Sequence, residues 1–236
     1  MSDTKLTVYA NTRQRENTLI RNVYGFMTLG LVLTAAVAWF AAHSETVIRF
    51  FLLNPVGSIV LMVAQLALVF YLSSRIEHMG TGTATICFFA YSALTGISLS
   101  AIFIAYAQIT IWKAFLTTAL MFAGMTVYAT LTKRNVAGWA NYLVMGLWGL
   151  IIASLVNMLL GSTMLDMVIS LVGIVLFTGL AIWDTRRVVE MNREYGSEMT
   201  AGEHTKLGII GALNLYLDFL NIFLYVLRLY AAADRD

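Results

Sequence analysis

The sequence predicts an all-α integral membrane protein with seven transmembrane helices, and two observations lead to this class. Hydrophobic residues make up 59% of the 236-residue chain and charged residues only 12%, which is outside the usual range of soluble domains. The charges also fall between seven long apolar runs. Each run is near or above the roughly 20 residues that a helix needs to cross a hydrocarbon core of about 30 Å.

The seven charge-free runs are taken as the spans, and turn residues mark several of their boundaries. Asn54 and Pro55 open the second span, "GTGT" separates the second from the third, and "LGST" separates the fifth from the sixth. The single Lys113 separates the third from the fourth. In order, the runs are Asn22–Ser44, Phe50–Ser74, Met79–Trp112, Ala114–Thr132, Asn135–Leu165, Met167–Trp183 and Leu207–Leu227.

The rest of the chain leaves no room for a soluble domain. Residues 1–21 form a polar N-terminal segment that lacks the features of a signal peptide, residues 22–230 form one seven-helix transmembrane domain, and residues 231–236 form a short tail. The longest connection is Thr185–Lys206. We expect it to extend the sixth helix and then turn near Gly196.

The distribution of Lys and Arg predicts the orientation. Eleven lie on the side of the N-terminus and four on the other, so the positive-inside rule places the N-terminus in the cytoplasm and, after seven spans, the C-terminus outside. The net charge is +2 and no basic stripe with interleaved aromatics is present, so we expect a lipid bilayer and no nucleic acid as partner. The eleven are Lys5, Arg13, Arg15, Arg21, Arg75, Lys133, Arg134, Arg186, Arg187, Arg193 and Lys206; the four are Arg49, Lys113, Arg228 and Arg235.

Two aspartates lie within this apolar sequence. Asp184 ends the sixth run and Asp218 is in the middle of the seventh. A carboxylate at membrane depth costs several kcal/mol unless it is paired, protonated or hydrated, and such residues are usually functional. Around Asp218, polar residues and one glycine recur in steps of three and four, which predicts that they share one helical face turned away from lipid. They are Gly211, Asn214, Asp218, Asn221, Tyr225 and Arg228.

If the two aspartates meet in a dry site, they cannot both ionise easily, so they titrate as a coupled pair that shares a proton or holds a cation. Calcium takes six to eight oxygen ligands, and Asn214, Asn221, carbonyls and water could add to the two acids in a transient site. Asp218 lies about 16 Å along the helix from Leu207, so a meeting requires that the last helix begin earlier or that the helices tilt. The alternative is that Asp184 is a helix-end carboxylate paired with Arg187.

The segments "AIWDTRR" and "GALNLYLDFLNIFLYVLRL" resemble the Bax inhibitor-1 family, which carries the transmembrane Bax inhibitor motif, and most of all its bacterial branch. The resemblance covers about Arg21 to Tyr230 and implies a bacterial inner-membrane protein whose last helix lies centrally between two three-helix layers. It also implies a pH-sensitive calcium leak channel gated by two hydrogen-bonded aspartates, here Asp184 and Asp218. A closing latch at the end of the second helix would be Arg75, although it stands about two positions late, and Arg187 is the other candidate.

Other functions are less consistent with the sequence. Intramembrane aspartyl proteases use Gly-x-Gly-Asp, whereas Leu215, Tyr216 and Leu217 precede Asp218, and a retinal protein needs a lysine in the last span, which holds none. We therefore expect no enzyme and no cofactor, with Ca²⁺ and protons as the ligands. A proton-coupled transporter, or a membrane-embedded regulator of stress responses or proteolysis with unknown protein partners, remains the alternative.

Overall fold

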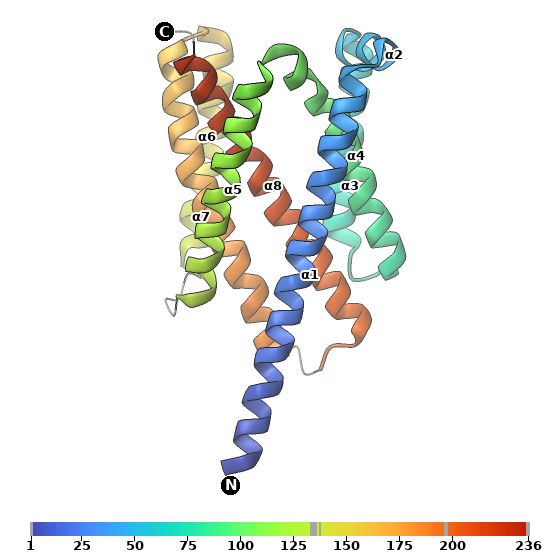
Figure 1. The fold of residues 1–236 in the computed structure, drawn as a ribbon, viewed down its shortest axis with the longest axis vertical. Coiled ribbons are helices and arrows are strands. Elements are labelled where there is room, and N and C mark those ends of the chain that lie inside the picture. Colours follow the sequence, from blue (N-terminus) through green and yellow to red (C-terminus); the bar gives the residue numbers. More distant parts are fainter. Residues whose placement is uncertain (1, 133–135, 137, 196–197, 235–236) are drawn as a thin grey trace. The chain divides into compact units, whose positions relative to one another are not determined.

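The computed structural model describes residues 2–132, 136, 138–195 and 198–234, and the side chains from Thr18 onward. In this part of the chain all regular structure is helical (Figure 1). The elements are α1 (Ser2–Ala42), α2 (Glu45–Val47), the π-helix η1 (Ile48–Leu52), α3 (Pro55–Arg75), α4 (Thr81–Ala105), α5 (Gln108–Leu131), α6 (Trp139–Leu160), α7 (Thr163–Tyr195) and α8 (Ala201–Ala233).

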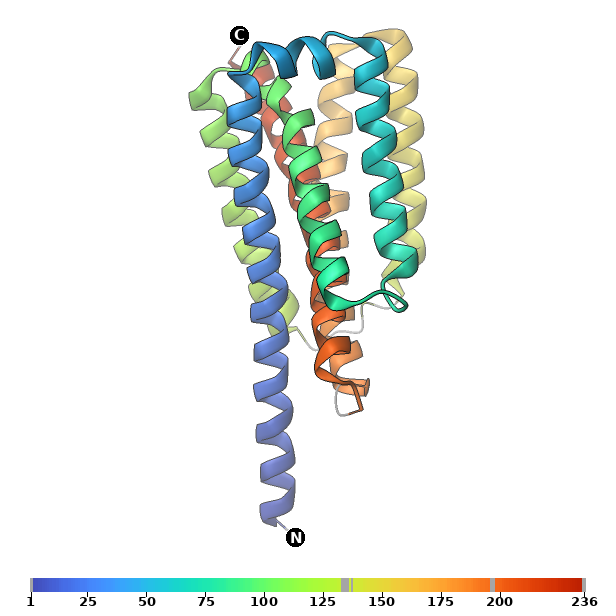
Figure 2. The same ribbon diagram turned by 90° about the vertical axis from the view of Figure 1, so that its right-hand side faces the viewer.

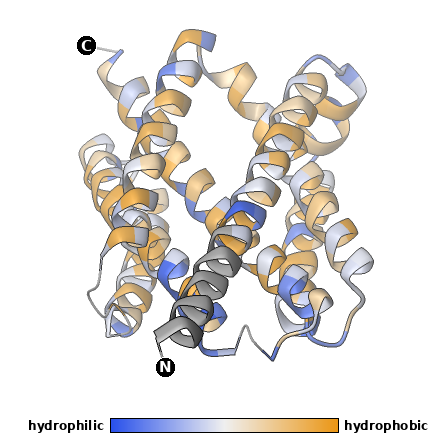
Figure 3. Ribbon diagram, turned by 60° about the horizontal axis from the view of Figure 1, so that its bottom comes forward, coloured by the Kyte–Doolittle hydropathy of each residue, from blue (hydrophilic) through white to orange (hydrophobic). Residues whose placement is uncertain are grey.

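Seven of these helices are long and apolar enough to cross a membrane, so the predicted all-α, seven-helix class is confirmed. Figure 3 shows hydrophobic residues over most of the length of the helices. The basic residues that predicted the orientation are only partly described. Lys133, Arg134, Arg235 and the turn expected near Gly196 lie outside the described residues, as do the side chains of Lys5, Arg13 and Arg15.

The predicted helix boundaries at turn residues are confirmed by their capping interactions. The Asn54 side chain accepts a hydrogen bond of 3.0 Å from the Val56 amide, and Pro55 takes the first position of α3, where its missing N–H is harmless. Helix α6 ends on Gly161 with φ of 64°, a left-handed conformation that favours glycine. Ser162 then accepts a 3.3 Å hydrogen bond from the Leu165 amide and so caps α7.

The boundary predicted at Lys113 is wrong. Helix α4 ends at Ala105 and α5 begins at Gln108, so Lys113 lies in the second turn of α5. Its ammonium is 3.9 Å from a carboxylate oxygen of Asp234, which also accepts a 2.7 Å hydrogen bond from Thr110. A lysine near a helix end can extend its long side chain toward polar surroundings, so a single lysine does not have to end a span.

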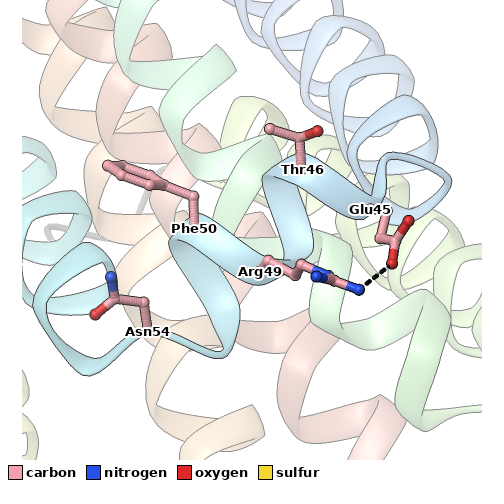
Figure 4. Close-up of a pocket in the computed structure, with 5 residues that line it drawn as sticks. All are labelled: Glu45, Thr46, Arg49, Phe50 and Asn54. Atoms are coloured by element: carbon pink, nitrogen blue, oxygen red, sulfur yellow. Dashed lines mark hydrogen bonds and ion pairs between the residues drawn. The ribbon is translucent and has the colours of Figure 1, made fainter.

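The start of the second apolar run is also not part of the second span. Residues Phe50–Leu52 belong to η1, a turn that packs closely against the beginning of α3. A Cβ atom on Gly57 would lie 1.8 Å from the Phe50 carbonyl oxygen, and the Ser58 hydroxyl donates a 2.7 Å hydrogen bond to the Phe51 carbonyl. Figure 4 shows the outer surface of this connection, where Arg49 pairs with Glu45.

The chain forms two compact units. The first contains residues 1–105 and 188–216, and in it α1 and α4 run side by side (Figures 1 and 2). The first half of α8 packs here through Tyr216, whose ring has edge contacts with Phe88 and Tyr91. Thr34 donates its hydroxyl proton to the Ser92 carbonyl at 2.8 Å and lies 2.6 Å from the Tyr216 hydroxyl. Because Thr34 has one O–H, Tyr216 is the donor to Thr34.

The second unit contains residues 106–187 and 217–236, and the second half of α8 packs within it. The ring of Phe219 lies against two rings of α5, with centroid distances of 5.8 Å to Phe115 and 5.4 Å to Phe122. Further along, the hydroxyl groups of Tyr230 and Thr117 are 2.9 Å apart. These contacts fix the rotation of α8 relative to α5.

The last helix is the most buried of the seven. In its most apolar eighteen-residue stretch 72% of the residues are buried, against 39% for α4, the next highest. In the described part of the chain, none of the large hydrophobic side chains that are exposed lies on α8. A helix that is apolar on most sides and carries a polar face is suited to such burial, in agreement with the prediction that the polar face of the seventh span is turned away from lipid.

Candidate functional site

The two intramembrane aspartates are together in the structure. Asp184 on α7 is 7% exposed and Asp218 on α8 is 5% exposed, and their carboxyl groups are hydrogen-bonded to each other. A hydrogen bond between two carboxyl groups needs a proton, because an ionised carboxylate is only an acceptor. The contact is therefore one that the two groups can make when they share a proton.

One of the two alternatives that would allow this meeting, an earlier start of the last helix, is present in the structure. Helix α8 begins at Ala201, six residues before Leu207, which adds about 9 Å of helix at 1.5 Å per residue. Its start is secured by a capping box, in which Thr200 and Glu203 exchange hydrogen bonds between side chains and backbone amides. Helix α7 continues past Asp184 to Tyr195, as expected for the predicted extension of the sixth span.

The same two helices also meet at a second place, where the Tyr225 ring lies on Gly173. This contact and the aspartate pair are separated by eleven residues on α7 and by seven on α8, or about 16 Å against about 10 Å of helix. The long side chain of Tyr225 can span this difference along the helix axis, so the two contacts require no particular angle between the helices.

On α7 the residues that face α8 form a stripe of their own, with steps of three and four. A Cβ atom on Gly173 would lie 2.5 Å from the Tyr225 ring, so glycine is needed there for the ring to pack on the helix backbone. Phe177 lies beside the same ring, with a centroid distance of 6.0 Å. The α7 stripe is Asp166, Ser170, Gly173, Phe177, Ala181 and Asp184.

The surroundings of the aspartate pair are mostly apolar. Ala181, one turn before Asp184, and Phe219, next to Asp218, are both buried, and the hydroxyl of Thr185 donates to the Ala181 carbonyl. One oxygen of the pair, Oδ2 of Asp218, is buried without a hydrogen-bond partner among the described residues. Such oxygens are rare in folded proteins, and this one could accept a proton, a water hydrogen or a cation.

The two asparagines that the sequence suggested as additional ligands, Asn214 and Asn221, differ in their surroundings. The amide of Asn221 donates a 2.8 Å hydrogen bond to the Leu217 carbonyl of its own helix, which leaves its side-chain oxygen as a possible ligand. Asn214 lies in the half of α8 that belongs to the first unit and is partly buried. No group of three or more His, Cys, Asp or Glu side chains in the described chain could hold a metal ion. A cation at the pair would therefore need carbonyls, amide oxygens or water as additional ligands.

The candidate latch residues are both exposed. Arg187 places its guanidinium 5.2 Å from the centre of the Trp183 ring, and Arg75 occupies the last turn of α3. The arginine that sequence reasoning overlooked is Arg186, which is 6% exposed and lies on α7 two residues after Asp184. The signal was its position, because Arg186 lies in the segment "AIWDTRR", two residues after Asp184.

Comparison with known proteins connects this geometry to a family. Residues 16–235 match the family model described as Inhibitor of apoptosis-promoting Bax1. The chain is 44% identical to the inner membrane protein YbhL of Escherichia coli K12 over 213 residues, which cover 90% of this chain and 91% of YbhL. It is 36% identical over 230 residues to an uncharacterized protein of Borreliella burgdorferi, covering 95% and 98% of the two chains. A Rickettsia prowazekii protein, RP147, is 37% identical over 206 residues, covering 87% and 86%.

Proposed function

Because the chain belongs to the Bax inhibitor-1 family, we propose that it is a pH-sensitive leak channel for Ca²⁺ or a similar cation. The buried, hydrogen-bonded pair of Asp184 and Asp218 is the observation that carries this proposal. The similarity to an E. coli inner membrane protein supports the bacterial inner membrane as its location. The excess of basic residues on one side supports a cytoplasmic N-terminus.

Protons and the cation act on the same oxygen atoms. With a shared proton, the two carboxyl groups attract each other and hold α7 against α8. Without it, two negative charges about 4 Å apart repel each other by about 4 kcal/mol at an effective dielectric constant of 20. This repulsion is relieved when the helices separate or when a divalent cation takes the place of the proton. Either response changes the packing between α7 and α8.

A weak site suits permeation better than a closed cage, because an ion that passes through a channel must also be able to leave. Two carboxylates supply fewer oxygens than the six to eight that Ca²⁺ prefers. Water and backbone carbonyls would complete the coordination only transiently. The exposed Arg187 and Arg75 are proposed as residues that favour the closed state, and their roles are secondary to the pair.

The test is calcium flux into liposomes that contain the purified protein and a calcium-sensitive dye, measured across a pH series. We expect a flux that depends on pH and that loses this dependence in Asp218→Asn, which keeps the size of the side chain but removes one ionisation. Glu45→Gln is the matched control, since Glu45 is an exposed carboxylate that pairs with Arg49 on the connection between α1 and α3. Wild-type pH dependence in the Asp218→Asn protein would overturn the proposal and leave a transporter or a regulator of other membrane proteins as the better function.

A further inference from the structure

A second polar feature lies at the other end of the interface between α7 and α8. A cavity of about 300 Å³ is lined by the turn between α6 and α7, the first turns of α7, the last turns of α8 and Tyr106. Its polar lining includes Asn157, Asp166, Ser170 and Arg228. Asp166 and Arg228 are 3.9 Å apart and each about half exposed, so they form a weak, hydrated ion pair.

Along the interface between α7 and α8, the residues next to the cavity carry aromatic side chains. Ser170, which lines it, is fully buried, and the next residue of the α7 stripe is Gly173, covered by the Tyr225 ring. Phe177, one turn further along α7, has its ring centre 6.0 Å from that of Tyr225. Arg228, which lines the cavity, has its guanidinium 5.4 Å from the centre of the Tyr225 ring, so the ring lies directly beside a residue of the cavity lining.

Beyond the ring, the same two stripes lead to the aspartate pair. On α7, Ala181 and Asp184 follow Phe177, and on α8, Asn221 and Asp218 precede Tyr225. The interface thus contains a polar cavity at one end, two aromatic rings in the middle and two acids at the other end. Apolar constrictions of this kind stop ions because water leaves them.

We propose that the cavity around Asp166 is a vestibule for a hydrated cation and that Tyr225 is the gate between this vestibule and the Asp184–Asp218 pair. The inference rests on the proposed channel function. Gly173 is part of the gate because only a residue without a side chain lets the ring lie on α7. Opening requires the ring to leave Gly173, and the half-exposed vestibule offers the space into which it can turn.

The first test measures water access with a membrane-impermeant, positively charged methanethiosulfonate reagent. Cys87 is the native cysteine, so Cys87→Ala provides the background. Thr163→Cys reports the rim of the vestibule, where Thr163 is exposed, and Ala181→Cys reports the region beyond the ring, where Ala181 is 2% exposed. We expect Thr163→Cys to react in every background. Ala181→Cys should react about tenfold or more faster once Tyr225→Ala removes the constriction.

The second test displaces the ring without changing it. Gly173→Ala places a methyl group against the Tyr225 ring, whereas Gly179→Ala on the same helix meets only a Leu143 methyl group at 2.9 Å. We expect Gly173→Ala to raise both the labelling of Ala181→Cys and the calcium flux at the pH of lowest wild-type flux, and Gly179→Ala to raise neither. Size-exclusion profiles check that each variant is folded. If Tyr225→Ala does not fold, the labelling and flux of Gly173→Ala test the gate in its place.

The outcomes separate the two proposals. If Ala181→Cys reacts with the reagent at the same rate with and without the Tyr225 ring, the gate is overturned, even if the wild-type protein conducts calcium. Absence of calcium flux in the wild-type protein would overturn the channel function, and faster labelling of Ala181→Cys in Tyr225→Ala would then still support the gate as a barrier to water and cations.

Discussion

The Asp218 carboxyl group on α8 is hydrogen-bonded to that of Asp184 on the antiparallel helix α7. Both residues are almost completely buried, and each lies on a stripe of residues that continues to the other end of the interface. The pair is therefore one end of a continuous contact between α7 and α8.

The two aspartates should behave as one unit. Asp184→Asn and Asp218→Asn each remove one ionisation, so each should reduce the ratio of calcium flux between two pH values to about one, and the double variant should add little, because coupled residues are not additive. Liposome flux measured for all four proteins checks this. Independent, additive effects would mean that the hydrogen bond does not couple the two groups.

Calcium should bind more tightly as the pH rises. If the pair shares a proton that a bound cation replaces, the dissociation constant should fall by up to about tenfold per pH unit where one proton is released. Calorimetry in two buffers of different ionisation enthalpy measures the protons released. The double Asp→Asn variant should release none, and an affinity of the wild-type protein that does not change with pH would contradict the prediction.

Close packing between α1 and α4 should depend on Gly96. A Cβ atom there would lie 2.7 Å from the Thr34 carbonyl oxygen and 2.8 Å from Val37 Cβ, so Gly96→Ala should lower the free energy of unfolding by about 1–3 kcal/mol. Gly124 on α5 has no atom within 4 Å of such a Cβ, and Gly124→Ala should be neutral or stabilising by up to about 1 kcal/mol. Thermal unfolding in detergent compares the two; equal effects would argue against tight packing.

The orientation can be tested with reporters that are active on only one side of the membrane. The excess of basic residues predicts that a reporter fused after Asp236 lies outside and that one inserted between α7 and α8, after Met199, lies in the cytoplasm. Cytoplasmic activity of the C-terminal fusion would mean that one of the seven helices does not cross. The insertion at Met199 serves as the internal reference for the same protein.

Much of the fold was predictable because transmembrane helices need long apolar runs. The number of spans, the caps at Asn54 and Gly161 and the burial of α8 all follow from local chemistry that the sequence contains. The break between α4 and α5 was missed because Lys113 is the only charge nearby. Its long side chain can pair with Asp234 without ending the helix, and such a pairing cannot be read from one segment.

The candidate site, like the fold, could be predicted from the sequence only in part. The sequence by itself determined that Asp184 and Asp218 lie in apolar helices and that the polar residues of α8 share one face, because helical periodicity decides which residues lie together on a helix. Only the tertiary structure decided what that face contacts. The packing of α7 against α8 brings the two aspartates together, and the missing side chain of Gly173 admits the Tyr225 ring. Such contacts depend on the angle and offset between helices, which are set by the packing of many side chains and are not encoded in the periodicity of either helix.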